Sequence, residues 1–189
     1  MQQVVFHGRG GQGAASSSAL LVVALHYDGK YGQAFPFFGG ERRGAPVRAF
    51  LRIDERPIIN RGPFDKPTCI VVLDTKLPDL VPVAAGLIPG GVAVLNSKKR
   101  PEDIDLGVNL STVGIVNAVE IAESVYGRSA IPTTNMVMLG AFAATTKWVS
   151  LESILRANDK KYSGPAASNN AKAVEMGYQA TMVSGGLER

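Results

Sequence analysis

The chain has 189 residues, a length that suits one domain able to bury its own core. Hydrophobic residues make up 46% and charged residues 19%, which excludes an intrinsically disordered chain. Lys and Arg outnumber Asp and Glu by 20 to 16, but the basic residues do not interleave with aromatic ones, so no nucleic-acid partner is expected. The sequence lacks an apolar run of about 18 residues and therefore predicts no membrane span.

The single cysteine, Cys69, lies in an apolar run typical of a buried strand, where we expect an inert core thiol. One cysteine cannot form an internal disulfide or hold an iron–sulfur cluster, and two histidines do not favour a zinc site. Glycines between Gly8 and Gly13 interrupt any apolar core of a signal peptide. These features predict a protein of a reducing compartment, the cytoplasm.

The N-terminal part predicts a strand, a glycine loop and a helix in that order. Residues 3–7 form a short apolar run of strand type, and residues 14–25 continue without a helix breaker after the glycines. Residues 27–45 are rich in glycine and aromatic side chains and are expected to form a long loop. Residues 47–53 alternate between two faces, as a strand does.

The middle of the chain predicts further buried strands. Apolar runs at 68–73, 92–95 and 109–113 have strand character, and residues 77–85 indicate a short helix or turn interrupted by prolines. Strands separated by helical or loop crossovers favour an α/β fold with a mostly parallel sheet.

The C-terminal third has a helical pattern from about residue 117. The pattern breaks near 127–132, 149–150 and 164–165, and the Ser- and Gly-rich tail over 182–189 is expected to be flexible. The sequence thus predicts one domain over residues 1–189, Rossmann-like in its first strand, loop and helix.

The segment Gly8-Arg9-Gly10-Gly11-Gln12-Gly13 matches the pattern G-x-G-x-x-G between a strand and a helix. Such a loop presents backbone amides and a helix N-terminus to an anion. A dinucleotide site would also need an acidic residue about 20 positions on, at the end of the next strand. The glycine-aromatic segment occupies that place, and Asp54 comes too late. Anion binding and simple helix–strand packing both remain open.

A second unusual segment combines Phe35-Pro36-Phe37-Phe38 with Glu41-Arg42-Arg43. Aromatic anchors beside arginines are typical of interface cores and phosphate pockets. The segment follows the first helix and can return to the glycine loop, at the carboxyl ends of the strands, where open α/β sheets bind ligands. A loop that only caps the core is the alternative.

Together these segments resemble the gamma subunit of 2-oxoacid:ferredoxin oxidoreductases, of which pyruvate:ferredoxin oxidoreductase is the best known. The resemblance lies in residues 8–14, 28–31, 33–36 and 41–47, and extends in order along the chain. Residues 134–142 resemble the family pattern Asn-Thr-x-Met-Leu-Gly-Ala, with different spacing and without the threonine after the asparagine.

The resemblance implies a complex that uses thiamine diphosphate, Mg and [4Fe–4S] clusters to convert a 2-oxo acid and coenzyme A into an acyl-CoA. Electrons pass to ferredoxin or a similar carrier. The expected partners are thiamine diphosphate-binding alpha and beta subunits and a ferredoxin-like iron–sulfur subunit. This chain has one cysteine and lacks the family's Gly-Asp-Gly…Asn motif, so it is expected to bind none of these cofactors wholly and to carry no catalytic residue or metal ligand.

Coenzyme A carries phosphates that suit a helix N-terminus and bidentate arginines. The expected contacts are in the glycine loop and the arginine pair: Gly8, Arg9, Gly10, Gly11, Gln12, Gly13, Arg42 and Arg43. Two alternatives remain: these motifs only dock the subunit on its partners, or the chain is a free-standing nucleotide-binding Rossmann-like domain.

Two polar residues outside these motifs are less informative. His7 borders the glycine loop and is expected to be either a structural histidine or a ligand contact. Asn135 follows Thr133 and Thr134 near the start of a helix, where one of the threonines is expected to act as the N-cap.

Overall fold

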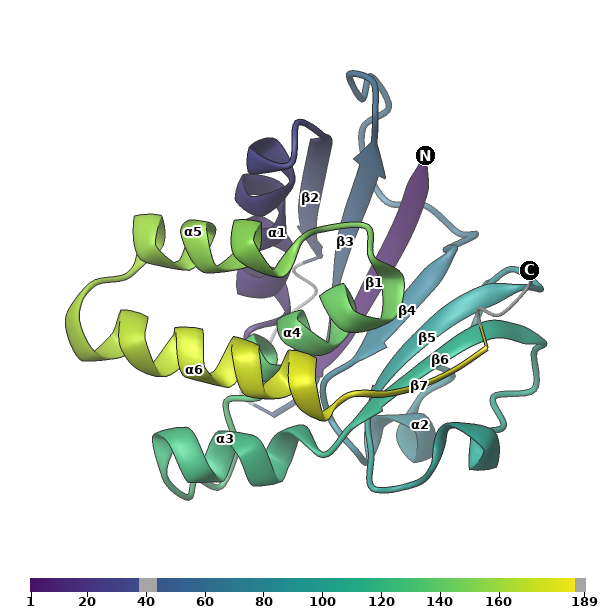
Figure 1. The fold of residues 1–189 in the computed structure, drawn as a ribbon. Helices are drawn as coiled ribbons and strands as arrows, with labels where there is room; N and C mark the ends of the chain where they lie inside the picture. The colour runs from purple at the N-terminus through teal and green to yellow at the C-terminus, as the bar shows by residue number, and fades with distance from the viewer. Residues whose placement is uncertain (38–43, 186–189) are drawn as a thin grey trace.

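The computed structural model describes residues 1–37 and 44–185. Within these residues the chain forms one seven-stranded sheet in the order β2-β3-β1-β4-β5-β6-β7 (Figure 1). The central strands β1, β4, β5 and β6 are parallel, whereas β2, β3 and β7 run antiparallel to their neighbours. The strands are β1 Gln2–Arg9, β2 Tyr31–Phe37, β3 Pro46–Asp54, β4 Cys69–Val72, β5 Gly91–Asn96, β6 Leu110–Val116 and β7 Met182–Gly185. The predicted α/β fold with a mostly parallel sheet is confirmed.

Most of the helices gather on one face of the sheet, and α2 lies on the other (Figure 1). The helical C-terminal third is confirmed, and its breaks fall where glycine, proline and serine interrupt the pattern. The helices are α1 Ala14–Tyr27, α2 Leu77–Leu80, α3 Ala118–Tyr126, α4 Asn135–Thr146, α5 Leu151–Lys161 and α6 Gly164–Ala180, with a 3-10 turn at Pro101–Asp103.

The predicted loop over residues 27–45 is wrong in part, because Tyr31–Phe37 form β2. A Cβ added to Gly32 would lie 2.9 Å from Leu25 Cδ1 and 3.0 Å from Val22 Cα, so a side chain there would have to push Leu25 aside and would crowd the backbone of α1. Ala34 also packs toward the helical core, while Phe35 lies on the opposite face against Arg52. The strand therefore alternates small with large residues rather than apolar with polar ones, which hid it from hydropathy.

The tail that the sequence predicts to be flexible from residue 182 begins as a strand. Met182–Gly185 pair antiparallel with β6, from Ile115 opposite Met182 to Thr112 opposite Gly185.

Alternate residues of the central strands point to opposite faces of the sheet and pack into two separate hydrophobic cores. Val71 and Val94 pack with α1, α4 and α6, whereas Ile70 and Leu95 pack with Leu77 of α2. Cys69 is fully buried, and burial raises the pKa of its thiol. A thiol with a raised pKa is a poor nucleophile, in agreement with an inert core residue.

Helices α4 and α6 approach closely enough for their backbones to touch. A Cβ on Gly140 would overlap the carbonyl oxygen of Val174, and a Cβ on Gly177 would overlap that of Val137. Each glycine has backbone of the other helix where a side chain would go. Glycine is costly in a helix interior, so here it is retained for packing rather than for helix propensity.

Replacing Gly140 with alanine should therefore destabilise the fold by about 2 kcal/mol or more, because the helices must separate. At an exposed helical site the same change stabilises by about 1 kcal/mol, so the sign of the effect is diagnostic. Urea denaturation of Gly140→Ala measures it, and a gain in stability would contradict the packing described.

Asp28, at the C-terminus of α1, holds the start of α5. Its Oδ2 accepts a hydrogen bond from Ser150 N (2.7 Å), and its Oδ1 accepts from Ser150 Oγ (2.7 Å) and Ser153 Oγ (2.6 Å). Burial raises the pKa of this carboxyl, but the hydrogen bonds from Ser153 and Ser150, with nearby Lys30, outweigh burial and hold the pKa below its usual value. The Asp28 carboxylate thus links the first helix to the C-terminal helices.

The variant Asp28→Asn should lower the free energy of unfolding by about 1–2 kcal/mol at pH 7, because the amide loses a charged acceptor. A depressed carboxyl pKa stabilises the fold above the pKa of the unfolded chain, about 3.9, and this contribution disappears as the pH falls through the folded value. The difference from wild type should therefore shrink below about pH 4 in denaturation curves. Glu175→Gln, at an exposed carboxylate of α6, is the control and should show neither effect.

Candidate anion-binding site

The connections of the sheet diverge between β1 and β4. These strands are parallel neighbours, but the chain leaves β1 toward α1 on one face and leaves β4 toward α2 on the other. In open α/β sheets such a divergence is where ligands bind, beyond the carboxyl ends of the strands. The glycine loop follows β1 here, and Asp74 follows β4.

Gln12 and Arg9 tie the glycine loop to Asp74. The Gln12 side chain is only 2% exposed; its Oε1 accepts from Arg9 N (2.8 Å) and its Nε2 donates to Asp74 Oδ2 (2.9 Å). Arg9 Nε lies 3.2 Å from the same carboxylate oxygen as an ion pair. Both predicted site residues thus have a role within the chain, and the charge of Arg9 is balanced by Asp74.

The glycine loop presents backbone amides that no other described residue uses. Gly11 and Gly13 have φ of +98° and +84°, the left-handed region that favours glycine. Gly13 is the N-cap of α1, which has no side-chain cap and no acidic residue in its first turn. Within the described residues, no acceptor contacts the amides of Gly11, Gly13 or residues 14–16. The loop therefore carries the partial positive charge of an open helix N-terminus.

The segment before β3 returns to this loop, as the sequence predicts. Gly10 N donates to Ala45 O (2.8 Å), and Gly44 N donates to Gly10 O (3.1 Å). Arg42 and Arg43 lie outside the described residues, but the residue that follows them is hydrogen-bonded to the glycine loop. Gly8, by contrast, belongs to β1, opposite Val47.

The start of α4 is held at the same edge of the sheet. Thr134 is fully buried, and its hydroxyl donates to Leu73 O (3.0 Å). The Thr134 side chain accepts no hydrogen bond from the first turn of α4, so the predicted capping by Thr134 is wrong. Its hydroxyl is instead bonded to the Leu73 carbonyl, just after β4. Asn96 Nδ2 donates to the same carbonyl (2.8 Å), and Asn96 Oδ1 accepts from Ala118 N (3.0 Å).

Sequence reasoning missed Asp74, Asn96 and the role of Thr134. The only available signal was the position of Asp74 and Asn96, each at the end of an apolar run and hence at the carboxyl edge of a parallel sheet.

His7 faces away from the glycine loop. With Arg48, Phe50 and Phe64 it lines a cavity of about 260 Å³ on the face of the sheet opposite α1. Its side chain is 8% exposed, and burial, together with the charge of Arg48, lowers its pKa to about 4. His7 is therefore neutral at physiological pH, as expected of a structural histidine.

A buried neutral histidine makes the fold sensitive to acid. Below pH 6.5 the unfolded chain binds a proton that folded His7 binds only near pH 4, so the free energy of unfolding should fall by about 1–2 kcal/mol between pH 7 and pH 5. His7→Gln should flatten this dependence in urea denaturation series. His26→Gln, at the exposed second histidine, should leave it as in wild type.

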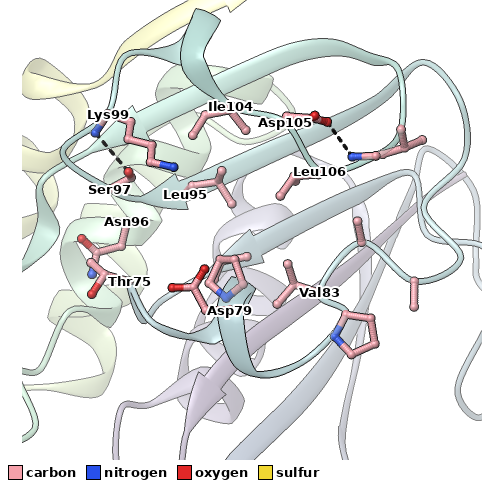
Figure 2. A pocket seen from close by; sticks show the side chains of 17 residues that line it. Thr75, Asp79, Val83, Leu95, Asn96, Ser97, Lys99, Ile104, Asp105 and Leu106 are labelled. Atoms are coloured by element: carbon pink, nitrogen blue, oxygen red, sulfur yellow. Dashed lines mark hydrogen bonds between the residues drawn. The ribbon is translucent and has the colours of Figure 1, made fainter.

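A larger cavity, of about 580 Å³, opens at the carboxyl ends of β4 and β5. Its walls come from residues 75–85 and 97–108. Figure 2 shows polar Thr75, Ser97 and Lys99 on one side of it and apolar Val83 and Leu106 toward the other. Thr75 directly follows Asp74, so the cavity adjoins the strand that holds the glycine loop.

In the described part of the chain, no three or more His, Cys, Asp or Glu side chains are placed to hold a metal ion. None of the helices formed by these residues has the length and apolar character to cross a bilayer.

The family model "Pyruvate ferredoxin/flavodoxin oxidoreductase" matches residues 3–180. The chain belongs to this family. It is 44% identical to the pyruvate/ketoisovalerate oxidoreductases common subunit gamma of Thermococcus kodakarensis, over 97% of this chain and 98% of the relative. It is also 44% identical to the pyruvate synthase subunit PorC of Methanothermobacter thermautotrophicus, over 95% of both chains.

A crystal structure of the pyruvate oxidoreductase subunit PORC of Thermotoga maritima has the same fold. Its TM-score is 0.79 at 34% identity, covering 97% of this chain and 98% of that one. The predicted resemblance to the gamma subunit of 2-oxoacid oxidoreductases is therefore confirmed, and with it the prediction of a subunit of an oxidoreductase.

Proposed function

We propose that this chain is the gamma subunit of a complex that uses thiamine diphosphate and iron–sulfur clusters to oxidise a 2-oxo acid to an acyl-CoA in the cytoplasm. Its partners are alpha and beta subunits that bind thiamine diphosphate with Mg, a ferredoxin-like subunit that carries [4Fe–4S] clusters, and an electron carrier such as ferredoxin. Those cofactors supply the decarboxylation and the electron transfer. One buried cysteine does not fit a cluster, so this chain contributes no redox step.

Within that complex we assign two tasks to this chain: docking against its partners and holding the phosphates of coenzyme A. The observation that carries the second task is the open set of amides at Gly11, Gly13 and the first turn of α1. These donors can bind a pyrophosphate without rearranging, because no group within the described residues competes for them. Gly44, which directly follows the arginine pair in the sequence, is hydrogen-bonded to the loop. We therefore assign Arg42 and Arg43 the positive charge of the site.

The choice of 2-oxo acid is assigned to other subunits. The Thermococcus kodakarensis relative is named as common to pyruvate and ketoisovalerate oxidoreductases. A gamma subunit shared between two substrates does not select between them. By the same reasoning, this chain binds the part of the reaction that all such enzymes share, which is coenzyme A.

The complex itself is tested first. An anaerobic affinity purification of this chain should recover a thiamine diphosphate-binding chain and a cysteine-rich chain, with iron and thiamine in the eluate. A chain that elutes alone, and binds a flavin or nicotinamide nucleotide by itself, would instead support a free-standing nucleotide-binding domain.

Substitution of the arginine pair tests the coenzyme A contact. In the assembled complex, Arg42→Gln and Arg43→Gln should each raise the KM for coenzyme A about tenfold, because a charge-assisted hydrogen bond is lost, with kcat little changed. Arg56→Gln, at an exposed arginine beyond β3, is the matched control and should leave KM unchanged. An unchanged KM in intact Arg42 and Arg43 variants would support docking as the only role of the pair.

A further inference from the structure

Two helix N-termini meet at the glycine loop. Helix α1 begins after Gly13 and helix α4 begins at Asn135. A Cβ built on Gly13 would lie 2.8 Å from Asn135 Nδ2 and 2.9 Å from its Cγ, so the Asn135 amide fills the space that a side chain at position 13 would need. The first turn of α4 therefore adjoins the N-cap of α1.

Neither N-terminus is compensated from within the described chain. The N-cap of α1 is a glycine, the hydroxyl of Thr134 is bonded to Leu73, and neither helix has an acidic residue in its first turn. By contrast, α3 and α5 are capped by Asn117 and Ser150, and each has a glutamate in its first turn. The peptide dipoles of both helices thus add positive potential at one place, where neither first turn supplies a balancing charge.

The side chain of Asn135 is buried there, and no described residue is its hydrogen-bond partner. It is 6% exposed, its Oδ1 is fully buried and unbonded, and its Nδ2 has no acceptor among the residues that the structure describes. A buried amide that makes no hydrogen bond is rare and unfavourable in a native structure. The neighbouring Gln12 and Asn96, in comparison, use both polar atoms of their amides.

Asp74, the carboxylate that the described residues place beside the loop, does not oppose an anion here. Asp74 is paired with Arg9, and its two oxygens accept hydrogen bonds from Gln12 Nε2 and Lys76 N. Its charge is therefore largely balanced by donors of the loop and of its own turn.

We propose that the N-terminus of α4 forms the second half of the phosphate site, so that a diphosphate group lies between the first turns of α1 and α4. Asn135 Nδ2 and the open backbone amides of residues 135–137 donate hydrogen bonds to oxygens of this diphosphate. The inference rests on the proposed function in that it uses the same glycine loop. It adds a binding residue from a distant part of the sequence and fixes the ligand class as a di- or polyphosphate.

Calorimetric titration of the full-length chain with inorganic pyrophosphate tests this assignment. Asn135→Asp keeps the size of the side chain but replaces the donor with a negative charge, and should weaken pyrophosphate binding about tenfold or more. A carboxylate at a helix N-terminus is favourable, so the melting temperature should not fall. A stable variant that loses binding separates a ligand contact from a structural role.

Ser163→Asp is the matched control. It adds the same charge at the N-terminus of α6, which also lacks a side-chain cap and an acidic first turn, and should bind pyrophosphate as wild type does. Asn135→Ala removes the donor without adding charge and should weaken binding several-fold, which keeps the test decisive if the aspartate variant folds poorly.

Pyrophosphate binding by Asn135→Asp or Asn135→Ala as tight as that of wild type would overturn the inference, as would a wild-type chain that binds no pyrophosphate. Neither result decides the proposed function, which depends on the KM for coenzyme A in the complex and on the co-purifying subunits.

Discussion

The carboxylate of Asp74 determines the shape of the edge on which the site is built. It lies two residues after the end of β4 and contacts both Gln12 and Arg9. These contacts fix the glycine loop from one side, while the backbone bonds to Gly44 and Ala45 hold it from the other. The carbonyl of the preceding residue, Leu73, accepts from Asn96 and Thr134 and thereby fixes β5 and the start of α4. Two consecutive residues at the end of one strand therefore position three segments that are far apart in the sequence.

This arrangement explains why the glycine motif lacks the acidic residue of a dinucleotide site. The strand beside β1 on one side is β3, which is antiparallel and begins rather than ends at this edge. On the β3 side of β1, therefore, no strand ends at this edge with the carboxylate that the ribose contact of a dinucleotide site requires. The carboxylate that does arrive, from β4 on the other side, is used to hold the loop.

Much of the fold could be predicted from local patterns. The first strand, the loop and α1 follow from one glycine motif, and the helical breaks follow from Gly127, Pro132 and Pro165, because these residues act on their own backbone. Strand β2 was missed because its two faces differ in size, set by the packing of Gly32 against α1, and not in polarity. Asp74, Thr134 and Asn135 could not be assigned, since their roles depend on contacts across the sheet that no local period encodes.

The contact between Gly13 and Asn135 also bears on how the protein is made. Gly13 is synthesised near the start of the chain, whereas Asn135 is synthesised only after six of the seven strands that the described residues form. A nascent chain that stops before α4 carries the entire glycine motif, yet it has only one of the two helix ends. The phosphate site proposed between the two helix ends can therefore form only late in synthesis, once the C-terminal helices have packed on the sheet.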